Sequence, residues 1–337
     1  GLWAPTLLAI MRFCQGLGLG GEWSGASLLA GENSRPGHRG FDAMWPQLGA
    51  PIGFLFANGF FYLLTQSMHY DSTTATHQHP FLIWGWRLPF LASLVIVVLG
   101  VYVRFKLDET PSFKKARAAG QVVKSPLRET FRTSWREVIR GTFVMLATYT
   151  LFYLMTTWIL SYAIGKTSSG LLGISYSRFL VLQLISIIAF AIMTPISGWL
   201  GDRFGRKAFP GTVTAAIAVF GLTFGLFLDR ARIGTGENAD MGHLLAFLLV
   251  GMTPMGLTFG IQSALLPELF PTNVRYTGSA IAYNVSSILG AAVAPFIAVA
   301  LWTYGAGSPF WVGVYLTVMA GLTFLSLFLG KETSGVD

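Results

Sequence analysis

Long stretches without a charged residue constrain this chain more than any other feature of its sequence. Residues 143–165 and 180–201 contain no Asp, Glu, Lys or Arg, and residues 276–330 extend this absence over 55 positions. A soluble helix needs a polar face at every turn, and these stretches have none. Because a helix of roughly 20 apolar residues crosses the hydrocarbon core of a membrane, the stretches predict transmembrane helices.

The whole chain follows this pattern, so we expect an all-α membrane protein. Only 11% of its residues are charged, against about 25% in an ordinary soluble domain. Backbone groups in lipid have no partner outside their own segment, which favours bundled helices. The single cysteine, Cys14, excludes a disulfide framework within the chain. The nine expected spans are residues 5–31, 42–66, 84–105, 141–164, 176–200, 207–228, 242–266, 277–303 and 309–330.

The distribution of lysine and arginine predicts the orientation of these spans. If they alternate in direction and the basic segment 105–140 is cytoplasmic, the opposite side holds only Arg87, Lys166, Arg178, Arg230 and Arg232. Such asymmetry is typical of membrane proteins. It accounts for the net charge of +8 without a nucleic-acid partner. We expect a multi-pass protein of the plasma or inner membrane, in contact with lipid, whose central loop and C-terminus are cytoplasmic.

An internal repeat divides the chain. The segments GENSRPGHRG and PELFPTNVRYTG each place a glutamate seven residues before an arginine, Glu32 with Arg39 and Glu268 with Arg275. Each pair follows a glycine-rich span and precedes two spans that end near a Glu-Thr pair, at 109–110 and 332–333. The expected domains are a partial N-terminal half with three spans (1–107), a basic cytoplasmic linker (108–140) and a six-span C-terminal half (141–337).

The repeat also predicts the size of the complete protein. The second unit has three spans before its Glu-Arg pair, so the first unit is expected to have three as well, preceding Gly1. The chain is then expected to be a fragment with nine of twelve transmembrane helices. The two six-span units would be related by an axis along the membrane normal.

One polar turn between two spans carries a specific motif. The segment GWLGDRFGRK, residues 198–207, resembles the signature loop G-x-x-x-D-R-x-G-R-K of the major facilitator superfamily. RFCQG, at residues 12–16, is similar to the R-x-x-Q-G pattern in the fourth helix of that superfamily. Together with GWRLPFLAS, LDETPSF and PELFPTNVRYTG, these motifs look most like the metabolite:H+ symporter branch.

This resemblance implies a major-facilitator-type helical bundle and a secondary active transporter. It implies uptake of a small polar metabolite, a carboxylate or a zwitterion, together with H+ by alternating access, in a monomer without a cofactor. No enzyme or metal signature appears in the sequence. Two alternatives stay open. One is a proton-coupled exporter of drugs or metabolites, whose fifth-helix glycine and proline pattern is only partly matched at residues 47–59. The other is a membrane sensor or scaffold that has lost transport.

The resemblance suggests that the signature loop belongs to a conformational switch on the cytoplasmic side. Its glycines allow a sharp turn and close helix approach. Asp202 is expected to accept hydrogen bonds from the helix N-terminus near Phe41, or to face Arg275. The basic residues are expected to meet Glu268, Glu32 or lipid phosphate; alternatively, they only follow the positive-inside rule. The candidate switch residues are Gly198, Asp202, Arg203, Gly205, Arg206, Lys207, Glu32, Arg39, Glu268 and Arg275.

Polar side chains within spans mark candidate substrate and proton sites. Arg12, Gln15 and Glu22 fall near one face of the first span, and a charge at mid-membrane costs roughly 2.5–3.5 kcal/mol. We expect this face to line a cavity, with Arg12 as an anion or relay group and Glu22 as a proton carrier. The alternative is a structural pair that braces the bundle. Further candidates are Tyr149, Tyr153 and Gln262, although an amide within a span often makes only an interhelical hydrogen bond.

Overall fold

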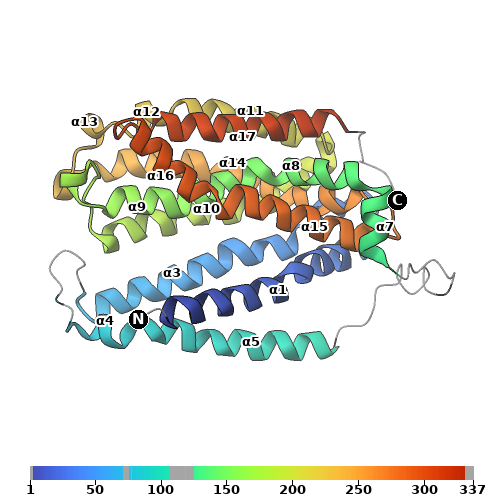
Figure 1. Cartoon of the computed structure of the whole chain (residues 1–337), viewed down its shortest axis with the longest axis horizontal. Coiled ribbons are helices and arrows are strands. Elements are labelled where there is room, and N and C mark those ends of the chain that lie inside the picture. Colours follow the sequence, from blue (N-terminus) through green and yellow to red (C-terminus); the bar gives the residue numbers. More distant parts are fainter. Residues whose placement is uncertain (1–2, 71–75, 77, 107–117, 119–124, 331–337) are drawn as a thin grey trace.

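The computed structural model describes residues 3–70, 76, 78–106, 118 and 125–330, which form an all-helical bundle without a β-strand. Figure 1 shows α1, α3 and α5 together on one side of the bundle and α8 to α17 on the other. We call the group from α8 to α17 the larger layer. The elements are α1 (Trp3–Glu32), α2 (Arg39–Ala43), η1 (Trp45–Leu48), α3 (Gly49–Ser67), α4 (Pro80–Ile83), η2 (Gly85–Arg87), α5 (Leu88–Lys106), α7 (Pro126–Thr133), α8 (Trp135–Tyr153), the π-helix η3 (Leu154–Trp158), α9 (Ile159–Ile164), η4 (Thr167–Ser169), α10 (Tyr176–Phe204), α11 (Ala208–Leu222), α12 (Phe224–Phe227), α13 (Arg230–Ile233), η5 (Gly236–Asn238), α14 (Met241–Glu268), α15 (Arg275–Ser287), the π-helix η6 (Ile288–Ala292), α16 (Ala294–Tyr304) and α17 (Phe310–Phe328).

The expected membrane fold is confirmed, with two differences in the spans. Within the described residues, seven helices are long and apolar enough to cross a membrane: Arg39–Ser67, Gly85–Val103, Trp135–Ile164, Tyr176–Phe204, Met241–Glu268, Arg275–Tyr304 and Phe310–Phe328. The expected span at 5–31 is helical as α1, but its polar residues and glycines make it less apolar than these seven.

The expected continuous span at 207–228 is wrong in its second half. Helix α11 ends at Leu222, and the chain bends by 50° before it continues as α12 and α13. At the break, the Thr223 hydroxyl donates to the Phe220 carbonyl at 2.7 Å, a bond that competes with the regular helical pattern. If this bent pair is one span, it is the eighth.

The end of the expected linker, at residue 140, falls inside a helix. Residues 135–140 form the first turns of α8, and Val138 among them is buried. Upstream, α7 is a short amphipathic helix at the surface. The two Glu-Thr pairs at 109–110 and 332–333 lie outside the residues that the structure describes.

Helices α10 and α14 pack closely along each other. Glycines make this approach possible: a Cβ on Gly256 would lie 2.6 Å from the Phe190 carbonyl oxygen of α10. The Ser197 hydroxyl donates to the Leu257 carbonyl at 2.6 Å and accepts from the Ile261 N–H at 3.0 Å. Small residues and hydroxyl groups therefore join these two helices, as is usual within membranes.

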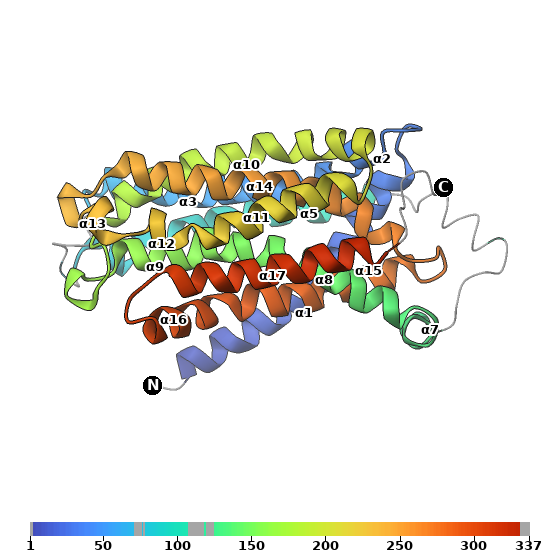
Figure 2. The same cartoon turned by 90° about the horizontal axis from the view of Figure 1, so that it is seen from above.

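Arginines collect at one end of the bundle, which we call the basic end. Figure 2 shows α2 beside the last turns of α10 at this end, which also carries α7. The basic residues of α2, of α7 and of the turn between α10 and α11 therefore lie on the same side of the apolar spans, while α4 and α13 lie at the opposite end (Figure 1).

Candidate functional site

At the basic end, Asp202 caps a helix from a distant part of the chain. Its carboxylate accepts hydrogen bonds from the backbone N–H groups of Gly40, at 2.7 Å, and Phe41, at 2.8 Å. These N–H groups belong to the first turn of α2, where backbone donors lack intrahelical partners and the helix dipole favours an anion. The contact expected from the sequence is therefore present.

Arg206 extends this contact to α14. One Nη1–H donates to Asp202 Oδ1 at 3.0 Å, four residues away, while Nε and Nη2 donate to the two carboxylate oxygens of Glu268 at 3.1 and 3.4 Å. Arg39 Nε lies 3.7 Å from Glu268 Oε1. Two carboxylates thus balance two guanidinium groups. We call these four residues the charged cluster.

The charged cluster is largely removed from water. The Arg206 side chain is 4% exposed and the Glu268 side chain is 2% exposed. Burial lowers the pKa of Arg206, but the charges of Glu268 and Asp202 and their hydrogen bonds outweigh it, so the pKa lies above its ordinary value. Arg206 therefore stays cationic, and removing either carboxylate would leave it partly uncompensated.

Glycines give the charged cluster its close packing. A Cβ on Gly198 would lie 2.7 Å from the Gly40 carbonyl oxygen, and a Cβ on Gly40 would lie 2.7 Å from Asp202 Oδ1. Gly205 ends α10 with a φ of 89°, a conformation that favours glycine. The motif glycines thus bring α2 against α10 and allow the turn that places Arg206.

The remaining switch candidates lie around the charged cluster. Arg203 is exposed and lies over the rings of Trp199 and Phe204, so of its expected partners, Glu268, Glu32 and lipid phosphate, the contact with lipid phosphate stays a prediction. Arg203 follows Asp202 directly and points to a different face of α10. Lys207 is half-buried at the start of α11.

Arg275 and Glu32 lie near the same end without joining the charged cluster by a hydrogen bond. The Nε–H group of Arg275 donates to the Phe270 carbonyl at 3.1 Å. Arg275 is close enough to Glu32, Arg39 and Glu268 for their charges to act on it. Asp202 thus uses the helix N-terminus of α2, the first of its two expected partners.

Three aromatic side chains, one each from α1, α8 and α15, pack together where α1 meets the larger layer. The rings of Trp23 and Tyr283 are stacked with centroids 3.9 Å apart, and Tyr149 meets Tyr283 edge-on at 5.4 Å. The indole N–H of Trp23 donates to Gln47 at 2.8 Å, and Gln47 donates to the Phe259 carbonyl at 2.8 Å. We call Trp23, Tyr283 and Tyr149 the aromatic trio.

Hydrogen bonds strengthen this junction of α1 and α15. The Tyr276 hydroxyl donates to the Gly21 carbonyl at 2.7 Å, and the Asn284 amide donates to the Gly20 carbonyl at 2.8 Å. A Cβ on Gly21 would lie 2.7 Å from the Tyr276 hydroxyl. The glycines of α1 thus face α15.

The polar stripe of α1 lies on its exposed side. Arg12, Gln15 and Glu22 are all exposed, and Arg12 donates to Gln15 at 2.9 Å. At 100° per residue, Glu22 points away from the face on which Gly20 and Ser24 meet α15. The structure thus brings Arg12 and Gln15 together, while Glu22 lies two turns further along the same exposed side of α1.

The other candidates lie inside the larger layer. Gln262 is buried and donates to the Thr148 hydroxyl at 2.7 Å, which joins α14 to α8. Tyr149 has a buried hydroxyl without a hydrogen-bond partner among the described residues. Tyr153 is half-buried one turn further along α8. Tyr149 is thus the one of these three that belongs to the aromatic trio.

Sequence reasoning missed Gln47, Tyr283 and the role of Trp23. Gln47 is buried at the start of a long apolar span, a polar position that could have drawn attention. Tyr283 carries no such signal, because membrane helices contain many tyrosines and only packing shows which of them meet.

Comparison with known proteins agrees with the fold. The family described as "Sugar (and other) transporter" matches residues 1–337. The chain is 47% identical over 334 residues to the inner membrane metabolite transport protein YhjE of Escherichia coli strain K12, covering 99% of this chain and 72% of that protein. Identity to the proline/betaine transporter of the same strain is 29% over 344 residues, with 99% and 64% coverage. Identity to its shikimate transporter is 28% over 343 residues, with 99% and 72% coverage.

Among solved structures, the proton:xylose symporter XylE has the same fold. Its TM-score is 0.68 over 92% of this chain and 68% of that one, at 16% identity. The family match over the whole chain, the relatives and the shared fold lead to one conclusion: the chain belongs to the sugar (and other) transporter family of the major facilitator superfamily, whose members are multi-pass membrane transporters and not enzymes.

Proposed function

We propose that the protein is a secondary active transporter that takes up a small polar metabolite with H+ by alternating access. The observation that carries this proposal is the closed charged cluster, in which Asp202 caps α2 while Arg206 binds Glu268. These contacts join α2 to α10 and α14, so the basic end opens only when they separate. Charge-assisted hydrogen bonds contribute about 1.5–3 kcal/mol each, enough to bias such an equilibrium.

The orientation and the division into halves belong to the same proposal. We place the basic end at the cytoplasmic face, because lysine and arginine favour that side. Residues 1–107 then form part of an N-terminal half, residues 108–140 a cytoplasmic linker and residues 141–337 a C-terminal half. The charged cluster lies between the two proposed halves, where alternating access requires a contact that opens and closes.

The substrate class is a zwitterion or a carboxylate. Two relatives are named for proline and betaine and for shikimate. Proline and betaine are zwitterions, and shikimate is a carboxylate. The aromatic trio favours a cationic group on the substrate, because ring faces attract ammonium ions. Arg12 is the proposed partner of an anionic group, and Tyr153 and Gln262 remain candidate contacts.

Glu22 is the proposed proton carrier. It lies ten positions before Glu32 at the end of α1, or about 15 Å along the helix, near the middle of a hydrocarbon core about 30 Å thick. A charged side chain at that depth is costly, so an intramembrane carboxylate is by default a candidate functional group. Gln15 lies seven positions before Glu22, about two turns along the same side of α1.

A transport assay tests this proposal. The protein is reconstituted in proteoliposomes, and uptake of labelled proline, glycine betaine and shikimate is measured with an inward H+ gradient and after its collapse by an uncoupler. We expect saturable uptake of a zwitterion or carboxylate that the uncoupler abolishes. Uptake that is independent of the gradient would contradict H+ coupling, and accumulation only in inverted vesicles would indicate an exporter.

A further inference from the structure

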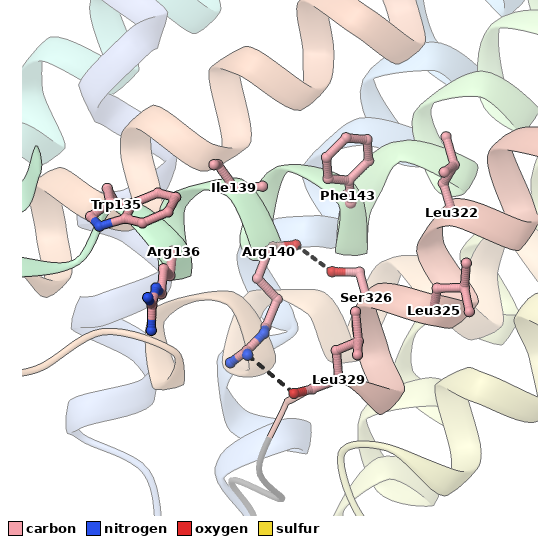
Figure 3. Close-up of a pocket in the computed structure, with 9 residues that line it drawn as sticks. All are labelled: Trp135, Arg136, Ile139, Arg140, Phe143, Leu322, Leu325, Ser326 and Leu329. Atoms are coloured by element: carbon pink, nitrogen blue, oxygen red, sulfur yellow. Dashed lines mark hydrogen bonds between the residues drawn. The ribbon is translucent and has the colours of Figure 1, made fainter.

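A groove on the outer surface of the bundle lies apart from the charged cluster and the aromatic trio. Its volume is about 400 Å³, and it runs between the start of α8 and the end of α17, at the basic end (Figure 3). The residues that line it are Trp135, Arg136, Ile139, Arg140, Phe143, Leu322, Leu325, Ser326 and Leu329. Leu325 is 59% exposed, so the groove is open to the surroundings of the bundle.

The groove has an apolar floor and a basic rim. In Figure 3, Arg136 and Arg140 project to the same side of α8, away from Ile139. Arg140 is held in position: its Nη2–H donates to the Leu329 carbonyl at 3.1 Å. A guanidinium has five N–H donors, so Arg140 keeps donors for a ligand. Arg136 lies over the ring of Trp135 at 5.3 Å.

Helix α7 precedes α8 and is separated from it by Ser134. Its exposed side chains include Leu127 and Phe131, which are apolar, and Arg128 and Arg132, which are basic. A short surface helix with apolar and basic side chains is typical of a segment that lies at an anionic membrane surface.

We propose that this groove binds an anionic phospholipid. Arg136 and Arg140 hold the phosphate of the headgroup, and an acyl chain lies on the apolar floor formed by Ile139, Phe143 and Leu325. Charge complementarity selects an anionic headgroup, and Trp135 is the first residue of the span Trp135–Ile164, a position typical of tryptophan at the membrane interface. The inference rests on the membrane location of the family and not on the substrate or on H+ coupling.

Lipid binding can be measured directly on the purified protein. The protein in detergent is titrated with dioleoylphosphatidylglycerol or dioleoylphosphatidylcholine, and bound lipid is counted by native mass spectrometry. We expect preference for phosphatidylglycerol. Arg136→Gln should weaken its binding about fivefold, because one cation at an anionic surface contributes about 1 kcal/mol. Arg136→Lys should retain most of the binding, and Leu325→Trp, which fills the apolar floor, should reduce it.

The matched control is Arg87→Gln. Arg87 also lies over a neighbouring indole ring, that of Trp86 at 4.4 Å, but at the opposite end of the bundle. The Arg87→Gln substitution should leave phosphatidylglycerol binding unchanged. Equal binding of the two lipids to the unmodified protein, equal losses in Arg87→Gln and Arg136→Gln, or no loss in Arg136→Gln would overturn the proposal. Thermal unfolding of each variant separates loss of the site from loss of the fold.

Discussion

The Asp202 carboxylate lies 2.7 Å from the backbone nitrogen of Gly40, which precedes it by 162 positions in the chain. The bond depends on the position of α2 and not on any side chain of its partner. Most side-chain substitutions in α2 therefore leave this hydrogen bond intact. Its strength is best tested by substituting Asp202.

Asp202→Asn should shift the protein towards the state that is open at the basic end. The variant keeps the shape of the side chain but loses the charge and one acceptor, so we expect a shift of about tenfold or more in the equilibrium. The measurement is maleimide labelling of Ala43→Cys, a buried position of α2, in a Cys14→Ser background. Asp42→Asn, which removes the carboxylate that pairs with exposed Arg35, is the control. Equal labelling of both variants would show that Asp202 does not hold this end closed.

Arg206 and Glu268 should be strongly coupled. Removing one member of a buried ion pair costs about 3–5 kcal/mol, because the other charge is left without compensation. We expect Arg206→Gln and Glu268→Gln each to lower the unfolding temperature markedly. The double variant should be more stable than the sum of the single losses predicts. Additive losses in this double-mutant cycle would contradict a direct interaction. The raised pKa of Arg206 means that its charge contributes at any pH below its ordinary value.

Gly198→Ala should disrupt the packing of α2 on α10. The added methyl group would meet the Gly40 carbonyl oxygen and the Phe41 Cα, both backbone atoms that cannot rotate away. Overpacking of this kind costs about 1–3 kcal/mol. Gly53→Ala in α3 is the matched control, since a Cβ there meets no atom within 4 Å. The unfolding temperature should fall in Gly198→Ala and should stay equal or rise in Gly53→Ala. The reverse order would refute the packing argument.

Tyr283→Leu should raise the KM for a zwitterionic substrate, whereas Tyr283→Phe should have a small effect. Leucine removes the ring that lies between Trp23 and Tyr149, and phenylalanine preserves it. Tyr276→Phe, which loses only the hydrogen bond to Gly21, serves as the control on the same helix. Uptake kinetics of labelled glycine betaine provide the measurement. A similar KM in all three variants would remove the aromatic trio from the substrate site.

Glu22→Gln should separate substrate binding from H+ coupling. The amide resembles the protonated carboxyl, so exchange of substrate across the membrane should continue while accumulation driven by a H+ gradient is lost. Both are measured in the same proteoliposomes. Gradient-driven accumulation at the level of the unmodified protein would exclude Glu22 as the proton carrier.

Much of this architecture is already contained in the sequence. The uncharged stretches predict membrane helices because lipid excludes exposed charge and unpaired backbone groups, and both constraints act on each segment separately. The contact of Asp202 with the start of α2 was also predictable, since the resemblance to the superfamily pointed to that helix and a helix N-terminus attracts an anion whatever its side chains.

Other relationships depend on how the helices rotate and pack against one another. The sequence leaves Arg203, Arg206 and Lys207 equivalent, whereas the structure shows Arg206 bound to Glu268 and Arg203 over the rings of Trp199 and Phe204. The face of α1 that meets α15 consists of Gly20, Gly21 and Ser24, while the more conspicuous Glu22 is exposed. Close approach of two helices requires small residues at the point of contact, so only the tertiary structure shows that the charged Glu22 lies away from this contact.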